Sequence, residues 1–116
     1  MTLRCRLTIP ALPVGPNGPK GLLRMHWARR AKYNESWKWL MLLWVVRTGQ
    51  DLVERGEIRI HQYRKRLLDI DNLYASCKPV IDALKGLVIV DDSPDRFSIK
   101  VTQEKGGGYI VVEVWE

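Results

Sequence analysis

Residues 66–92 read RLLDIDNLYASCKPVIDALKGLVIVDD and lead from a basic strand end to an acidic pair at positions 91–92. A helix is predicted to begin within DIDN and to continue to about Lys85, because residues that cap helices precede it. Pro79 falls inside this helix, so its first part is expected to be a separate turn or a kinked helix, since proline lacks a backbone donor. Residues 88–90 are apolar and predict a short strand.

The sequence on either side of this segment alternates between apolar and polar residues, which is typical of half-buried strands. In residues 3–9, for example, apolar side chains alternate with Arg4, Arg6 and Thr8. A region in which aromatic and aliphatic residues recur every three or four positions predicts a long helix, and a glycine-rich stretch at 104–108 predicts a hairpin. We therefore expect strands at 3–9, 58–63, 97–103 and 109–115, and helices at 25–46 and 72–85.

The resulting order, β-α-β-α-β-β, predicts an α+β fold with a mixed four-stranded sheet and two helices packed against it. The length of 116 residues matches a single domain over residues 1–116. Aromatic and β-branched residues are plentiful and the charges are mixed in sign, which excludes a disordered chain. Cys5 and Cys77 form no metal-ligand motif and are expected to be inert thiols.

The charge balance indicates the kind of partner. A formal net charge of +6, from 19 Lys and Arg against 13 Asp and Glu, favours a polyanion such as nucleic acid. The most apolar run, residues 37–46, is about half as long as a membrane span, and the N-terminus lacks the pattern of a signal peptide. We therefore expect a cytoplasmic protein without a membrane partner.

Asp69 and Asp71 are the first candidates for chemistry. At an extended strand end, side chains two residues apart point to the same side, so the two carboxylates are expected to form a pair. Such oxygens suit Mg²⁺, and a third carboxylate from Asp91 or Asp92 completes the set if the loop after residue 90 folds back. Three neighbouring carboxylates stay ionised only when a cation neutralises them, which is the physical reason to expect a metal.

Lys78 follows Asp71 by seven residues, which is two turns along the same face of a continuous helix. A cation there is expected to contact the scissile phosphate or to stabilise the leaving oxygen as negative charge develops. Taken together, the pattern fits hydrolysis of a phosphodiester in a positively charged groove. Each part also has a structural interpretation, because DxDN caps helices, Asp-Asp pairs occur in turns and single lysines usually face solvent.

Four motifs occur in this order along the chain: DIDNL at 69–73, Lys78, DAL at 82–84 and VDD at 90–92. Together they resemble the RusA family of Holliday-junction resolvases, small endodeoxyribonucleases often carried by phages and prophages. The resemblance extends more loosely to residues 7–10, to the region of His26 and Trp27 and to the last strands, so it covers nearly the whole chain.

The resemblance implies a homodimer with one Mg²⁺-dependent site per subunit, which cuts two opposing strands of a four-way junction in DNA recombination and repair. It implies that the metal-binding carboxylates are Asp69, Asp71 and Asp92. Asp91 is a neighbouring candidate ligand, and Lys78 is the essential lysine. Basic side chains are then expected to hold the DNA backbone, so that affinity falls with salt; they are Arg29, Arg30, Lys32, Arg64, Lys65 and Arg66.

The residues leave three other functions open. One is Mg²⁺-dependent cleavage of flaps or other branched DNA. Another is non-catalytic binding of DNA or RNA, in which the acidic residues only cap helices. The third is an interaction adaptor that uses the tryptophan-rich helix, in which Trp37 and Trp44 are expected in the core and Trp39 is expected to be partly exposed.

Overall fold

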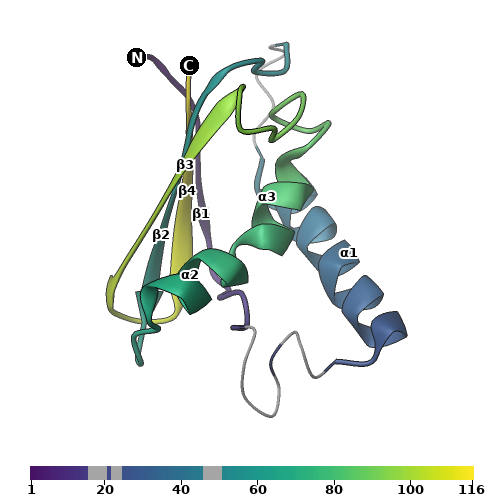
Figure 1. Ribbon diagram of the computed structural model, residues 1–116, viewed down its shortest axis with the longest axis vertical. Helices are drawn as coiled ribbons and strands as arrows, with labels where there is room; N and C mark the ends of the chain where they lie inside the picture. The colour runs from purple at the N-terminus through teal and green to yellow at the C-terminus, as the bar shows by residue number, and fades with distance from the viewer. Residues whose placement is uncertain (16–20, 22–24, 46–50) are drawn as a thin grey trace.

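The computed structural model describes residues 1–15, 21, 25–45 and 51–116. Its strands are β1 (Leu3–Ile9), β2 (Gly56–Arg64), β3 (Phe97–Lys105) and β4 (Tyr109–Trp115), and its helices are α1 (Trp27–Trp44), α2 (Ile70–Ser76) and α3 (Lys78–Leu84). The helices lie on one face of the sheet (Figure 1). The predicted single α+β domain with a mixed four-stranded sheet and the order β-α-β-α-β-β is confirmed.

The sheet has the strand order β1-β4-β2-β3, which makes β1 and β3 its edges. β4 pairs antiparallel with both β1 and β2. β2 pairs in parallel with β3 along its whole length, from Gly56 opposite Phe97 to Arg64 opposite Lys105. A parallel pair needs a long crossover connection, and that connection carries α2 and α3, the part of the chain that holds the candidate site residues.

The predicted second helix is divided at Cys77, which ends α2 and precedes α3. Pro79 lies in the first turn of α3, where its missing N–H would have had no helical partner. Of the two alternatives, a separate first part is therefore the one observed. The strand predicted at 88–90 is absent, because the chain turns at the end of α3, where the backbone N–H groups of residues 87–89 donate to the Leu84 carbonyl oxygen. Ile89 forms only isolated bridges with Val53 and Lys85.

The core lies between the sheet and the helices. Alternate residues of the central strands, such as Ile60 and Val112, are fully buried, and burial of each such side chain contributes about 1.5–3 kcal/mol. Trp37 of α1 packs there with 2% of its surface exposed, and Trp39 is 62% exposed, both as predicted. Trp44 is 44% exposed, so its predicted core position is wrong. Among the helices that the structure describes, none is long and apolar enough to cross a membrane.

Candidate functional site

Asp69 is the N-cap of α2. Its Oδ1 accepts a hydrogen bond from the Asn72 backbone N–H at 3.0 Å, and its Oδ2 accepts one from Asn72 Nδ2 at 3.2 Å. Asp71 lies in the first turn of the same helix, where negative charge is stabilised by the partial positive charge of the helix end. Both carboxylates are on exposed residues. The two acidic residues of DIDN thus lie at one helix terminus, with Asp69 in the structural role typical of this motif.

Asp92 lies beside α3. Its Oδ1 is 3.0 Å from Lys85 Nζ, and the same ammonium group is 3.2 Å from Asp82 Oδ1. Burial by itself would raise the pKa of Asp92, but the hydrogen bond and charge of Lys85 outweigh burial and lower that pKa. The Asp92 backbone N–H donates to Asp91 Oδ1 at 2.8 Å, so one Asp91 oxygen already accepts a hydrogen bond from its neighbour.

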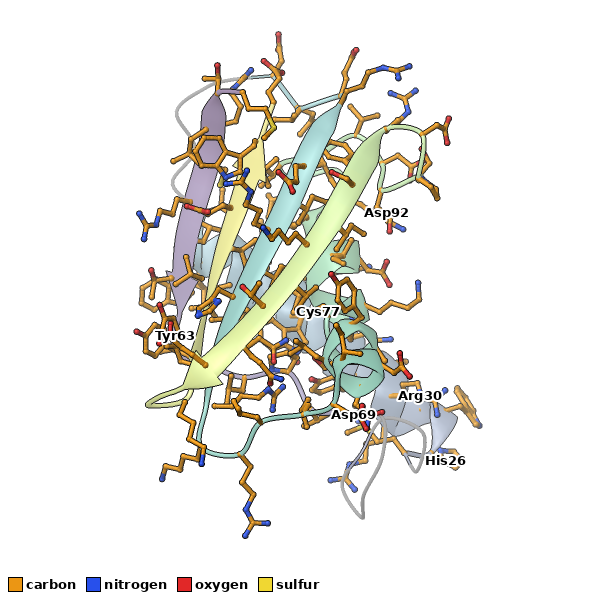
Figure 2. All side chains as sticks on the ribbon, turned by 60° about the vertical axis from the view of Figure 1, so that its left-hand side comes forward. His26, Arg30, Tyr63, Asp69, Cys77 and Asp92 are labelled. Atoms are coloured by element: carbon orange, nitrogen blue, oxygen red, sulfur yellow. The ribbon has the colours of Figure 1, made fainter. Side chains whose placement is uncertain are left out.

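Asp69 and Asp92 lie toward opposite ends of β3. Leu68, which precedes Asp69, contacts Gln103 near the end of that strand, whereas Asp92 comes shortly before the strand begins. Figure 2 shows the two aspartates well separated along the molecule. In the part of the chain that the structure describes, no three Asp, Glu, His or Cys side chains lie close enough to hold a metal ion. In this conformation the chain does not present the predicted three-carboxylate set for Mg²⁺.

Lys78 begins α3, and its side chain is 77% exposed. Its Nζ is 3.8 Å from Asp82 Oδ2, a weak surface contact. The alignment of Lys78 with Asp71 along one face required a continuous helix, and this condition is not met, because the two residues belong to separate helices that meet at Cys77. Any joint role of Lys78 and Asp71 therefore depends on the orientation of α2 against α3.

Arg64 was a predicted DNA contact, yet it is only 9% exposed. Its Nε donates to Gln62 Oε1 and a terminal nitrogen donates to Pro13 O, both at 2.5 Å. Gln62 in turn donates to Ser76 Oγ and Cys77 Sγ, each at 3.0 Å. Arg64 is thus part of a buried network that joins β2 to the α2–α3 junction. The prediction that Arg64 contacts DNA is wrong, because its side chain has this structural role instead.

The other predicted cations have varied exposure. Lys65 and Arg66 are exposed directly after β2. Arg29 and Lys32 are exposed on the first half of α1, and Arg30 is half-buried. The surface therefore offers basic side chains from two separate elements, the end of β2 and the start of α1.

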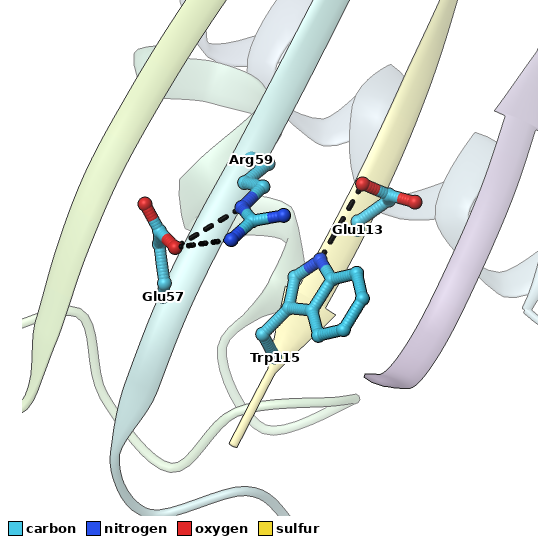
Figure 3. Close-up of polar contacts among 4 residues, drawn as sticks. All are labelled: Glu57, Arg59, Glu113 and Trp115. Atoms are coloured by element: carbon cyan, nitrogen blue, oxygen red, sulfur yellow. Dashed lines mark hydrogen bonds and ion pairs between the residues drawn. The ribbon is translucent and has the colours of Figure 1, made fainter. Parts of the chain in front are cut away.

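The open face of the sheet carries a polar cluster that the sequence pattern did not single out. Arg59 donates to Glu57 Oε2 from Nε at 3.0 Å and from a terminal nitrogen at 2.9 Å (Figure 3). Its guanidinium lies 4.6 Å from the Trp115 ring centroid, and the Trp115 indole N–H donates to Glu113 at 3.4 Å. The period-two pattern of the strands was the signal in the sequence that could have placed these polar side chains together on the outer face of the sheet. Because Glu57 neutralises Arg59, this cluster orders the face and offers little free charge.

Comparison of the chain with protein-family models, with curated proteins and with solved structures gave no match. Function therefore has to be inferred from the residues of this chain. The features available are the exposed carboxylates at the start of α2, the exposed lysine of α3, the acidic pair after residue 90 and the basic side chains of α1 and the β2 end.

Proposed function

We propose that the chain is a cytoplasmic Mg²⁺-dependent endodeoxyribonuclease that acts on branched DNA in recombination and repair, with the four-way junction as substrate. The observation that carries this proposal is the exposed pair Asp69 and Asp71 at the start of α2, followed by Lys78 and Asp92 in the order that resembles the RusA family. Phosphodiester hydrolysis requires stabilisation of the negative charge that develops around the phosphate. The four side chains of this set carry charges that can serve this purpose.

The proposed function requires the loop after residue 90 to move toward the start of α2, because Asp92 lies toward the other end of β3 from Asp69 (Figure 2). Asp92 pairs with Lys85 at 3.0 Å, and it has to leave that lysine to join Asp69 and Asp71. The pair is accessible to such a change, since the side chains of Lys85 and Asp92 are 38% and 24% exposed. Exposed ion pairs contribute only about 0–1 kcal/mol, so opening this one is a small part of the cost of that movement.

The charge of the chain supports DNA as the substrate. The net charge is +6, and two elements carry exposed basic residues: Arg29 and Lys32 on α1, and Lys65 and Arg66 after β2. Contacts of this kind release counterions, so binding is expected to weaken steeply with salt. We also propose a homodimer, because a two-fold dimer supplies two equivalent sites for the two equivalent strands of a junction.

The test is incubation of the purified protein with a synthetic four-way junction, a flap and a plain duplex, in Mg²⁺ and then in EDTA. We expect paired cuts in the junction in Mg²⁺ only. Asp71→Asn should bind the junction as the wild type does but should not cut it. Asp95→Asn, which changes an exposed loop aspartate outside the candidate site, is the matched control and should cut normally. Cleavage retained by Asp71→Asn rules out Asp71 as an essential residue.

A second candidate function is non-catalytic binding of nucleic acid. It is favoured by one observation, that Asp69 and Asp92 already have structural partners in Asn72 and Lys85. Under this alternative, EDTA leaves nucleic-acid binding unchanged and no substrate is cut. Asp69→Asn then also leaves both binding and stability nearly unchanged, because asparagine caps helices about as well as aspartate.

A further inference from the structure

In the part of the chain that the structure describes, no strand pairs with the outer edge of β3, and residues of the segment around α2 contact this strand. The backbone N–H of Val101 donates to the Tyr74 hydroxyl at 3.3 Å, so a side chain of α2 satisfies a donor of the edge strand. Unpaired edge donors otherwise have to be satisfied by water or by another chain. The segment that contains α2 is therefore attached to the edge of β3 by hydrogen bonds.

Gln103 of β3 makes the most specific of these contacts. Its Oε1 accepts from the Leu68 backbone N–H at 3.0 Å, and its Nε2 donates to the Leu68 carbonyl oxygen at 2.6 Å. One side-chain amide thus satisfies both polar groups of a single backbone residue, as the backbone of a neighbouring strand would. Side chains of similar length do not replace this amide, because ionised glutamate lacks the donor and methionine has no donor and only a weak acceptor.

Leu68 is the residue directly before Asp69, and the contacts continue from it into the site. Asp69 caps α2 through the Asn72 N–H, and the Asn72 side chain donates to the other Asp69 oxygen. Gln103, Leu68, Asp69 and Asn72 therefore form one bonded series from the sheet to the first turn of α2. A displacement of Leu68 would be transmitted to both carboxylates of DIDN.

We propose that Gln103 is a positioning residue that fixes Asp69 and Asp71 relative to the sheet. Its effect on catalysis rests on the proposed nuclease function, whereas its effect on the position of residues 68–72 does not. Misplacement of reacting groups by about 1 Å reduces enzymatic rates by roughly a hundredfold. The loss of Gln103 should therefore act on the rate of cleavage rather than on DNA binding, which uses other side chains.

The experiment compares the wild type with Gln103→Met, Gln103→Ala and the control Ser98→Ala, an exposed position near the start of the same strand. Hydrogen exchange followed by NMR reports the Leu68 and Asn72 amides, and cleavage of a four-way junction reports kcat and KM. For both Gln103 variants we expect exchange at these amides to be at least tenfold faster, kcat to be at least tenfold lower and KM to be unchanged. Exchange in the middle of β2 should not change.

Ser98→Ala should match the wild type in every measurement. Unchanged exchange at Leu68 and Asn72 in both Gln103 variants overturns the proposal, and so does faster exchange with an unchanged kcat in a protein that cleaves DNA. If the wild type cuts no DNA while the exchange at residues 68–72 rises as expected, the nuclease function fails and the positioning of the two carboxylates stands. Gln103→Met retains the side-chain length, so it separates lost hydrogen bonds from lost packing.

Discussion

Lys85 Nζ lies 3.0 Å from Asp92 Oδ1, and this contact fixes the acidic pair after residue 90 against α3. The same ammonium group is 3.2 Å from Asp82 Oδ1, so one cation lies between two carboxylates. Hydrogen bonds to Asp92 and Asp82 raise the pKa of Lys85, and the lysine lowers the pKa of Asp92 against the opposing effect of burial. Two neighbouring carboxylates can be held together by a metal ion, but Asp82 and Asp92 are held together by the ammonium group of Lys85.

Replacement of Lys85 by methionine should raise the pKa of Asp92 above its value in the wild type. The reason is that burial, which raises this pKa, would then act without its main opposing partner. Because the groups are partly exposed, the free energy of unfolding should fall by less than about 1 kcal/mol. Carboxyl-carbon NMR titration measures the pKa. Lys78→Met is the control and should change it less; an equal change would show that Asp92 responds to general surface charge.

Asp69→Ala should lower the free energy of unfolding by about 1 kcal/mol, the usual cost of losing an N-cap. Asp69→Asn should cost only a few tenths of a kcal/mol, because the amide oxygen still accepts the N–H of residue 72. Urea unfolding measures both. Asp71→Ala is the comparison at the same helix end, and it should cost less than Asp69→Ala since the cap hydrogen bond is made by Asp69. Equal losses for Asp69→Ala and Asp69→Asn would contradict the capping role.

The sequence was sufficient to predict the fold because the alternation of strands and helices is a local property. Each strand could be identified from its period of two, and the mixed sheet followed from their order. The sequence did not decide whether the second predicted helix is kinked or divided, since Pro79 is compatible with both a kink and a helix start; the structure divides it at Cys77. The apolar stretch at 88–90 was misassigned because local hydrophobicity does not reveal that the chain turns there, with its N–H groups bonded to the Leu84 carbonyl at the end of α3.

The candidate site was predicted less completely, because it depends on contacts between distant residues. The capping alternative for Asp69 was available from DxDN itself, a motif of adjacent residues. The burial of Arg64 against Pro13, 51 positions away, has no local signal in the basic run that contains it. The contact between Gln103 and Leu68 likewise joins residues 35 positions apart. The convergence of Asp69, Asp71 and Asp92 stays a prediction that the cleavage experiment tests.

Cys77 should make the protein less stable at alkaline pH. The thiol is fully buried, and burial raises its pKa from 9.0 to about 11 although Gln62 and Ser76 donate hydrogen bonds to it. Between these two values the unfolded chain releases a proton that the folded chain retains. The stabilisation is therefore complete below pH 9 and is lost as the pH rises toward 11, at up to about 1.4 kcal/mol per pH unit.

Urea unfolding at pH 8, 9, 10 and 11 measures this loss. Cys77→Ala is the control, because it removes the titrating group and leaves other alkaline titrations, including that of Lys85, in place. The stability of the wild type should fall more steeply than that of Cys77→Ala over this range. Parallel curves for the two proteins would show that the Cys77 thiol does not contribute.

Gly56 and Gly86 both have a positive φ, of 155° and 76°, but only Gly56 is also confined by its surroundings. A Cβ at Gly56 would lie 1.7 Å from the backbone oxygen of Trp115, at the point where β2 begins to pair with β4. A Cβ at Gly86 would meet nothing within 4 Å. Gly86→Ala therefore carries only the conformational cost of about 1–2 kcal/mol, whereas Gly56→Ala must also displace backbone.

Gly56→Ala should lower the free energy of unfolding by more than about 3 kcal/mol, a loss typical of steric conflict with fixed backbone. Thermal or urea unfolding of the two variants beside the wild type measures the difference. Because the pairing of β2 with β4 holds the centre of the sheet, Gly56→Ala should also speed hydrogen exchange at the ends of both strands. Similar losses for the two variants would mean that positive φ alone decides the cost and that the end of β4 moves aside freely.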